Sequence, residues 1–236
     1  MVWLSRLLGG PESSREGLTV RQKALLAAWR SLPVPDMGRS HYRSRYVVVD
    51  VETVGSDWQS DPLGSIGALA LVDGLIDFQQ ALQVVVTDAH TAYPTHAAGQ
   101  ALAQHASSEQ RADALLAFLA FVGKAPLVAY HASFATRRIE RAIAESLGIE
   151  LRLPWIDLAW VMGSLFREMG DAQARMDSWL THFGVDSIER HNAVSDAYAT
   201  AMLLQITIAR AARTGFETPT SLLGLEKAHR HLYQSA

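Results

Sequence analysis

The sequence predicts an α/β fold in which a mixed β-sheet, made of an antiparallel meander and parallel strands, is flanked by α-helices. Two observations support this prediction. Three apolar, strand-like segments follow one another early in the chain, and a tight turn joins two of them. Further along, short apolar segments alternate with segments of helical periodicity, and this order places the later strands parallel.

The strand-like segments begin with a β-branched run at Tyr46, whose continuous hydrophobicity is typical of a strand covered on both faces. Segments 65–72 and 75–86 follow, separated by Asp73-Gly74, a dipeptide that readily adopts the positive φ angles of a hairpin turn. We expect the run after Tyr46 to form the central strand. Two shorter strands are expected at 127–130 and 155–157.

Capping residues and periodicity locate the helices. Thr19, Ser107 or Ser108, and Asp157 are suited to accept hydrogen bonds at helix starts. The expected helices span residues 20–32, 108–122, 134–147, 158–166, 176–183 and 192–212. The last of them has an apolar stripe made of Ala193, Ala197, Ala201, Leu204 and Ile208. Small residues in this stripe predict close packing of the helix against the sheet.

Length and composition indicate one folded domain with appended segments. The 236 residues are 49% hydrophobic and 19% charged, which is far from a disordered composition. We expect a helical extension and linker at 1–45, a main domain at 46–213 and a C-terminal tail at 214–236. The absence of cysteine excludes disulfides, cysteine-based zinc sites and thiol nucleophiles. With no expected membrane span or convincing signal-peptide cleavage site, we expect a cytoplasmic location.

Asp50 and Glu52 are the most informative residues of the chain. They are two apart in the predicted central strand, so their carboxylates project from the same face. Two neighbouring anions repel each other and are costly to desolvate, and a divalent cation such as Mg²⁺ or Mn²⁺ would compensate both. The alternative is that Asp50-Val-Glu52 merely marks a solvent-exposed strand end.

A second cluster, His191 and Asp196, lies at the start of the last predicted helix. Asp196 is a candidate third metal ligand, and the imidazole of His191 is a candidate general base because it titrates near neutral pH. The alternative is that Asp196 complements the helix dipole while His191 caps the helix.

Three segments, in this order along the chain, resemble the motifs of the DEDDh family of 3′-to-5′ exonucleases, which includes the proofreading subunit of bacterial replicative polymerase. These segments are Asp50-Val-Glu52-Thr53-Val-Gly55, Leu127-Val-Ala-Tyr-His-Ala-Ser-Phe134 and His191-x-Ala193-x-x-Asp196-Ala197. The resemblance covers about residues 46–212 and implies a ribonuclease H-like fold.

The resemblance also implies an activity, which is hydrolysis of the terminal phosphodiester at single-stranded DNA or RNA 3′ ends with release of nucleoside monophosphates. It implies two Mg²⁺ or Mn²⁺ ions. By matching position, Asp50, Glu52 and Asp196 would be metal ligands and His191 the general base.

Three further positions match residues that contact the substrate in the family. Thr53 and Gly55 would lie under the terminal nucleotide. Phe134 would brace the second motif.

The chain departs from the family pattern at Ala135, where the family has an aspartate that helps to hold the second metal ion. Three explanations stay open: an engineered change, a natural loss that weakens or abolishes activity, or a relocated carboxylate. Candidates for the relocated carboxylate are Asp57, Asp61 and Glu140. The departure motivates an alternative function, a non-catalytic module of the same fold that binds nucleic-acid ends or a partner protein.

The net charge of −3 gives no overall basic field, so any contact with nucleic acid has to be local. The basic segment 39–45 is compatible with phosphate contacts or with a solvated linker. Arg137, Arg138 and Arg141, together with Lys124, form either a phosphate-binding edge or a solvated helix face. The extension 1–45 is also a candidate binding segment for a protein partner.

Overall fold

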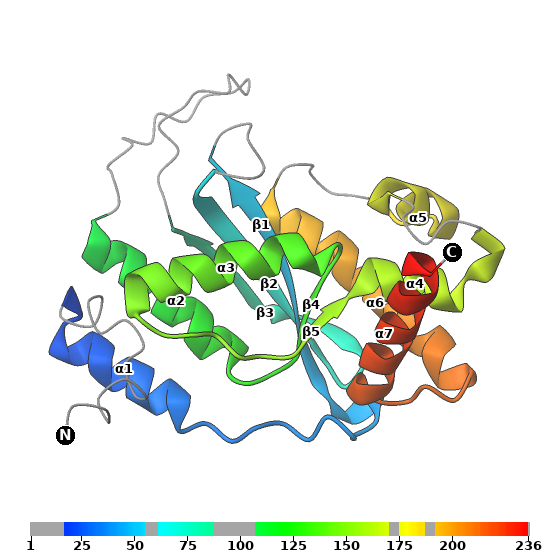
Figure 1. The fold of residues 1–236 in the computed structure, drawn as a ribbon, viewed down its shortest axis with the longest axis horizontal. Coiled ribbons are helices and arrows are strands. Elements are labelled where there is room, and N and C mark those ends of the chain that lie inside the picture. Colours follow the sequence, from blue (N-terminus) through cyan, green and yellow to red (C-terminus); the bar gives the residue numbers. More distant parts are fainter. Residues whose placement is uncertain (1–16, 55–60, 87–106, 170–174, 187–191, 236) are drawn as a thin grey trace.

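One mixed β-sheet forms the centre of the protein, as Figure 1 shows. The computed structural model describes residues 17–54, 61–86, 107–169, 175–186 and 192–235. Within these ranges the sheet has the strands β1 (Arg45–Thr53), β2 (Leu63–Val72), β3 (Leu75–Val85), β4 (Leu127–Ala129) and β5 (Trp155–Asp157). They lie in the order β3-β2-β1-β4-β5. The β1–β2 and β2–β3 pairs are antiparallel and the β1–β4 and β4–β5 pairs are parallel, so the predicted fold class is confirmed.

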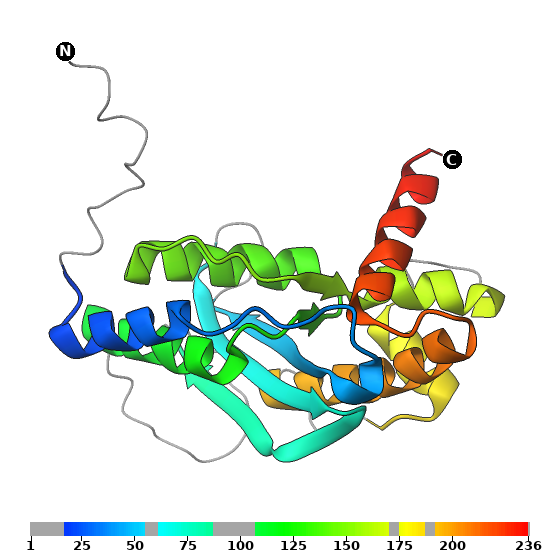
Figure 2. The same cartoon turned by 90° about the horizontal axis from the view of Figure 1, so that it is seen from below.

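The helices of the described residues cover both faces of this sheet (Figures 1 and 2). They are α1 (Val20–Arg30), α2 (Ser108–Val122), α3 (Ala132–Leu147), α4 (Leu158–Leu165), α5 (Met176–Phe183), α6 (Ala193–Arg213) and α7 (Pro219–Gln234). Short 3₁₀ turns occur at His41–Arg43 and Arg167–Met169. Helices α2 and α3 pack on one face of the sheet, and α4 and α6 pack on the other.

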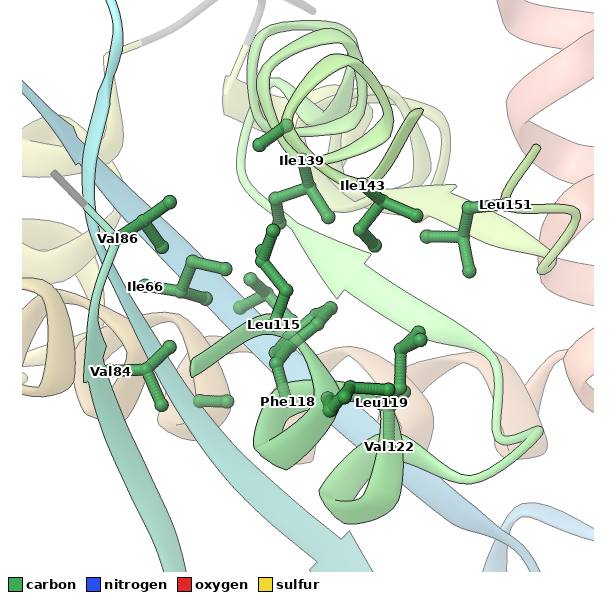
Figure 3. Packing of buried hydrophobic residues seen from close by; sticks show 14 of the residues in the cluster. Ile66, Val84, Val86, Leu115, Phe118, Leu119, Val122, Ile139, Ile143 and Leu151 are labelled. Carbon is green, nitrogen blue, oxygen red and sulfur yellow. The ribbon is translucent and has the colours of Figure 1, made fainter. Parts of the chain in front are cut away.

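The central strand β1 separates two hydrophobic cores because successive side chains of a strand point to opposite faces. Val47 and Val49 belong to the core under α2 and α3, whereas Tyr46 and Val48 belong to the core under α6. Figure 3 shows part of the first core, where side chains from β2 and β3 meet those of α2 and α3. Each fully buried apolar side chain contributes about 1.5–3 kcal/mol to folding.

The hairpin between β2 and β3 has the predicted turn. Asp73 and Gly74 have φ angles of 52° and 83°, and both values fall in the left-handed region that a tight hairpin turn of this type requires. The turn directs β3 back along β2, and β3 forms the outer edge of the sheet.

Helix boundaries follow the predicted caps, with differences of one residue at α4 and α6 and of two residues at α1 and α3. Thr19 and Ser107 accept hydrogen bonds from the backbone of α1 and α2 as predicted. Helix α3 begins at Ala132, two residues before the expected start, because His131 adopts a left-handed conformation (φ 56°) that turns the chain directly from β4 into the helix. Helix α1 ends at Arg30 and not at Leu32, because Ser31 closes its last turn.

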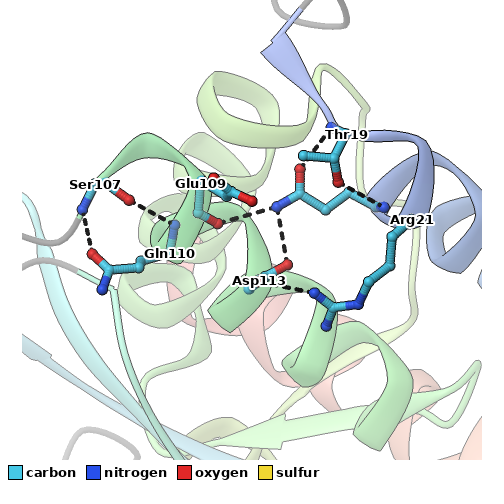
Figure 4. Close-up of polar contacts among 7 residues, drawn as sticks. Thr19, Arg21, Ser107, Glu109, Gln110 and Asp113 are labelled. Atoms are coloured by element: carbon cyan, nitrogen blue, oxygen red, sulfur yellow. Dashed lines mark hydrogen bonds and ion pairs between the residues drawn. The ribbon is translucent and has the colours of Figure 1, made fainter.

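The segments at both ends of the described chain pack against the main domain. Gln22 of α1 donates to the Glu109 carbonyl (3.1 Å) and the Asp113 carboxylate (2.9 Å), and Arg21 pairs with Asp113 (3.3 Å). Figure 4 shows Arg21 beside Asp113. At the other end, Arg230 of α7 pairs with Asp157 (2.8 Å). The division of the chain at residues 45/46 and 213/214 stays a prediction.

Among the helices that the structure describes, none has the length and apolar character needed to cross a membrane.

Candidate metal centre

Three carboxylates converge at the C-terminal end of β1. Asp50 and Glu52 come from β1, and Asp196 comes from the first turn of α6. Each offers one oxygen, and these oxygens all lie within 4.8 Å of one another. Within the described ranges, no other group of three or more histidine or acidic side chains is arranged in this way. The structure therefore brings together the three residues that the sequence predicted as ligands, and their role as ligands stays a prediction.

The alternation of β1 explains why two of these carboxylates share a face. Asp50 and Glu52 continue the series of Tyr46 and Val48, whose side chains pack in the core under α6. Both acidic side chains are half-buried, and they lie where β1 leaves the core. The last two side chains of this series, those of Asp50 and Glu52, therefore lie next to the N-terminal end of α6.

The start of α6 places Asp196 opposite β1. The Asn192 side chain accepts hydrogen bonds from the N–H groups of Val194 (3.1 Å) and Ser195 (3.2 Å), so Asn192 is the cap. The alternative interpretation placed the cap at His191, which lies outside the described residues. Asn192 itself was the missed sequence signal, because asparagine is among the preferred N-cap residues.

Gly67 allows α6 to approach the sheet at this point. Gly67 lies on β2 directly beside Asp50 of β1. A Cβ atom on Gly67 would overlap the backbone of Ala193 and Val194, so only glycine permits this contact. The backbone contact fixes how far Asp196 lies from Asp50 and Glu52.

The donor set fits a divalent cation. Asp196 is 8% exposed, and its Oδ1 atom is buried without a hydrogen-bond partner among the described residues. A buried carboxylate oxygen without a donor, close to two further carboxylates, is unfavourable unless a cation compensates it. Carboxylate oxygens are the ligands that Mg²⁺ and Mn²⁺ prefer.

The predicted substrate-contacting residues are placed in part. Thr53 is the last residue of β1 and is half-buried beside the carboxylates. Phe134 lies in the first turn of α3, and the Arg138 guanidinium stands 5.3 Å from its ring centroid. Gly55 and His191 lie outside the described residues.

Ala135 lies in the second motif, and its methyl group is buried. It is 4% exposed and belongs to the apolar core under α2 and α3. Neither Asp61 nor Glu140 belongs to the carboxylate group, and Asp57 lies outside the described residues. The pKa of Glu140 is raised by burial and by the charge of Glu150, which follows the C-terminal end of α3.

A buried ion pair that sequence reasoning missed supports the start of α3. Asp157 is 2% exposed and accepts hydrogen bonds from Ala159 N–H (3.2 Å) and from Arg230 (2.8 Å). Burial raises the pKa of Asp157, against the opposing charges of Arg230 and His131 and a hydrogen bond from the Ala132 backbone. The carboxylate thus links β5 and α7 to the first residues of α3. Its capping role was predicted, but no local signal pointed to Arg230.

Of the four basic residues proposed as one phosphate-binding edge, Lys124 is separated from the three arginines of α3. Arg138 is buried and donates to the Asp61 carbonyl, and Arg141 pairs with Glu145. Lys124 instead stands over the ring of Trp29, at the other end of the sheet. The sequence did not reveal this separation. Lys124 lies in the turn between α2 and β4, and α3 places the arginines away from that turn.

A ribonuclease H-like sheet with acidic side chains at the C-terminal end of its central strand defines a class of nucleases. Residues 47–204 match the sequence model of the RNase_T family, which is described as an exonuclease family. This chain belongs to that exonuclease family. The exonuclease relationship expected from the three motifs is therefore confirmed.

Two curated relatives are PolC-type DNA polymerases III. The chain is 26% identical over 174 residues to the one from Clostridium perfringens (strain 13 / Type A), which covers 70% of this chain and 11% of the relative. It is 26% identical over 164 residues to the one from Thermotoga petrophila, which covers 70% of this chain and 12% of the relative. The chain thus spans about a ninth of the length of these curated relatives.

Solved structures of nucleases share the fold. Cell-death related nuclease 4 has a TM-score of 0.51 at 14% identity, over 75% of this chain and 67% of that one. The nuclease domain of 3′hExo, a DEDDh family member bound to rAMP, has a TM-score of 0.51 at 14% identity, over 76% of this chain and 97% of that one. At such identities the likeness concerns the fold alone.

Proposed function

We propose that this protein is a metal-dependent 3′-to-5′ exonuclease of the DEDDh type, which removes nucleoside monophosphates from single-stranded DNA or RNA ends. The single observation that carries the proposal is the convergence of Asp50, Glu52 and Asp196 within 4.8 Å. Membership of the exonuclease family supports the reaction class. The direction of hydrolysis and the kind of strand are proposals.

In this proposal Asp50, Glu52 and Asp196 hold Mg²⁺ or Mn²⁺ at the end of β1. A divalent cation bound there would supply charge neutralisation at the scissile phosphate and a lowered pKa for the attacking water. The β2–α6 contact at Gly67 keeps the three carboxylates in position before substrate binds. Such preorganisation is how protein groups lower the barrier of phosphoryl hydrolysis.

The remaining roles follow from position in the motifs. His191 accepts the proton of the attacking water as general base. Thr53 and Gly55 lie under the terminal nucleotide, and Phe134 braces the second motif at the start of α3. The guanidinium of Arg138 over the Phe134 ring restricts the rotation of that ring, which favours a fixed contact surface.

Ala135 removes one ligand of the second metal ion of the family. A methyl group offers no ligand, and Asp61 and Glu140 do not join the carboxylate group. We therefore expect slow hydrolysis in the natural sequence, which Ala135→Asp increases by about 100-fold if it restores one charge-stabilising contact.

An assay with single-stranded DNA and RNA labelled at the 5′ end tests the proposal. In Mn²⁺, removal of nucleotides from the 3′ end gives a ladder of shortening labelled products, whereas 5′-to-3′ hydrolysis releases the label at once. Asp50→Asn should abolish the ladder. The matched control Glu168→Gln removes an exposed carboxylate that pairs with Arg210, and it should leave the ladder unchanged. Absence of a ladder in both the natural sequence and Ala135→Asp would contradict the proposal.

A second candidate function, a non-catalytic module that binds nucleic-acid ends, is favoured by Ala135 alone. It predicts metal-dependent oligonucleotide binding without turnover in the natural sequence and in Ala135→Asp. Isothermal titration with Mn²⁺ separates both candidates from a purely structural acidic cluster. Both require Asp196→Asn to weaken Mn²⁺ binding and Glu168→Gln to leave it unchanged.

A further inference from the structure

A groove with a volume of about 560 Å³ lies at the opposite end of β1 from the carboxylates. One wall is the linker between α1 and β1, and the other is the end of α2 with the turn into β4. Arg45, the first residue of β1, lines the groove. Figures 1 and 2 show this linker as it runs along the edge of the domain from α1 to β1.

Basic side chains dominate the charge of the groove. Arg39, Arg43, Arg45 and Lys124 line it, together with the acidic residues Asp36 and Asp73. The Arg45 guanidinium is engaged, since it donates to the Phe121 carbonyl (2.9 Å) and the Val122 carbonyl (3.2 Å). In contrast, neither Arg39 nor Arg43 forms an ion pair with any residue that the structure describes. Both are exposed and oriented only by the linker that carries them.

Lys124 adds a cation to the groove, and Arg30 is a further cation near it. The Lys124 ammonium stands 3.3 Å from the ring centroid of Trp29. Its pKa is lowered by burial and by the charge of Arg30. Of the acidic groove residues, Asp36 accepts a hydrogen bond from the Gly38 N–H (2.9 Å), which commits that oxygen to the linker turn. A bound anion would be attracted by the exposed cations Arg39 and Arg43.

We propose that the basic groove, defined by Arg39, Arg43 and Lys124, binds backbone phosphates of the same single-stranded nucleic acid whose 3′ end occupies the carboxylate centre. This inference rests on the proposed function and extends it to substrate length. Apolar side chains beside the cations, such as Leu32 and Pro35, suit the ring of a base or ribose.

The distance along β1 sets the length of strand required. Seven residues separate Arg45 from Glu52, which is about 23 Å at about 3.3 Å per residue. A strand has to extend over several nucleotides to reach from the carboxylates to the groove, so short oligonucleotides cannot engage both. The linker with Arg39 and Arg43 precedes residues 47–204 that match the exonuclease family, and the groove is thus built in part from a segment outside the family region.

The test measures binding of fluorescent oligothymidylates of 3, 6, 12 and 20 nucleotides by anisotropy, in Ca²⁺, which binds carboxylate oxygens, and at several salt concentrations. The variant Arg39→Gln/Arg43→Gln removes two exposed charges from the groove. Its control, Arg175→Gln/Lys227→Gln, removes two exposed charges from α7 and the start of α5. For the 20-mer, we expect the groove variant to bind more weakly, with a slope of log K against log salt reduced by about 1.4. For the 3-mer, we expect the groove variant and the natural sequence to bind equally.

Three results would overturn the inference. These are an unchanged salt slope for the 20-mer, an equal loss for the 3-mer and the 20-mer, or the same slope change in the control variant. Competition arms identify other ligands. If polyglutamate displaces the 20-mer as well as unlabelled oligonucleotide does, the groove recognises acidic peptides; if AMP alone displaces it, the groove takes a free nucleotide.

The outcome is separable from that of the proposed function. Asp50→Asn is expected to abolish hydrolysis while the difference in salt slope between natural sequence and groove variant remains. If no variant hydrolyses DNA or RNA but the length-dependent slope change is found, the proposed function is refuted and the inference that the groove binds nucleic acid stands. If hydrolysis is found but the salt slope is unchanged, only the inference about the groove is refuted.

Discussion

Gly67 of β2 and Ala193 of α6 are in direct backbone contact, and a Cβ atom on Gly67 would overlap the Ala193 carbonyl group. Gly67 is also the cross-strand neighbour of Asp50, and Ala193 lies one helical turn before Asp196. One glycine therefore sets the separation between the two chain segments that carry the carboxylates. The site depends on a packing contact as much as on its acidic residues.

Gly67→Ala should separate α6 from the sheet and weaken metal binding. We expect a loss of about 1–3 kcal/mol in the free energy of unfolding, because the added methyl group overpacks a rigid backbone contact. Urea denaturation measures this loss, and Mn²⁺ titration measures the affinity. The control Gly224→Ala lies in α7 with no atom near its added Cβ, and it should leave Mn²⁺ affinity unchanged. Equal Mn²⁺ affinity in Gly67→Ala and the natural sequence would refute the positioning role.

Ala135→Asp should make the stability of the protein depend on metal. The Ala135 methyl group is 4% exposed, so a carboxylate there is desolvated and costs about 1–3 kcal/mol in EDTA. If the carboxylate faces the metal centre, Mn²⁺ binding compensates that cost and raises the melting temperature more than in the natural sequence. Thermal unfolding with EDTA and with Mn²⁺ measures both effects. A variant that is equally unstable in both solutions would place position 135 away from the metal.

Arg230→Met should destabilise the protein most at neutral pH. Burial raises the pKa of Asp157 and of Glu226, and the Arg230 charge opposes both shifts. Without Arg230, two buried carboxylates lack their cation, and we expect a loss of about 1–3 kcal/mol because Arg230 itself is 35% exposed.

The pH dependence of this loss has a definite sign. Asp157 and Glu226 have folded-state pKa values above their ordinary values, so lowering the pH through these pKa values neutralises them and stabilises the folded state. The loss caused by Arg230→Met should therefore shrink from about pH 7 to about pH 4. Urea denaturation across this range measures it, with Lys227→Met, an exposed cation of the same helix, as the control. A loss that is constant with pH would contradict the ion-pair explanation.

His41→Phe should destabilise the contact between the linker and the segment after α6. His41 is fully buried, with its ring nitrogens 2.6 Å from the Tyr46 hydroxyl and 2.9 Å from the Phe216 carbonyl. The substitution leaves these two partners without hydrogen bonds, and an unsatisfied buried polar group costs about 1–3 kcal/mol. The free energy of unfolding in urea at neutral pH measures the loss.

Acid should reduce the difference between His41→Phe and the natural sequence. Burial lowers the pKa of His41, so the unfolded chain binds a proton at this position more readily than the folded protein. Stability from His41 is present above its ordinary pKa of 6.5 and is lost as the pH falls through the range below that value. Urea denaturation at several pH values below 7 measures this, and a difference that grows in acid would refute it.

The order of secondary-structure elements was predictable because its signals are local. Thr19 and Ser107 cap their helices, Asp73-Gly74 turns the hairpin, and small residues line the buried face of α6. The start of α3 was not predictable, since His131 adopts a left-handed backbone conformation that side-chain preferences disfavour. Such a conformation is maintained by its surroundings, here the β4–α3 connection.

The acidic residues of the candidate site were predictable from the sequence, and the family resemblance implied that they converge, but no local pattern determined that convergence. Two-residue spacing in β1 required Asp50 and Glu52 to share a face. Whether Asp196 would reach them depended on how closely α6 packs on β2. Gly67 permits this close packing, and it belongs to no recognisable sequence motif. The same holds for Arg230, which reaches Asp157 from a distant helix.

The sequence by itself determined the strand and helix order, the shared face of Asp50 and Glu52, and the missing carboxylate at Ala135, because each depends on residue type and near neighbours. Only the tertiary structure decided that Asp196 meets the strand acids, that Arg230 stabilises Asp157, and that Arg39 and Arg43 line a groove with Lys124. These contacts join residues far apart in the chain, and their geometry follows from packing of helices on the sheet.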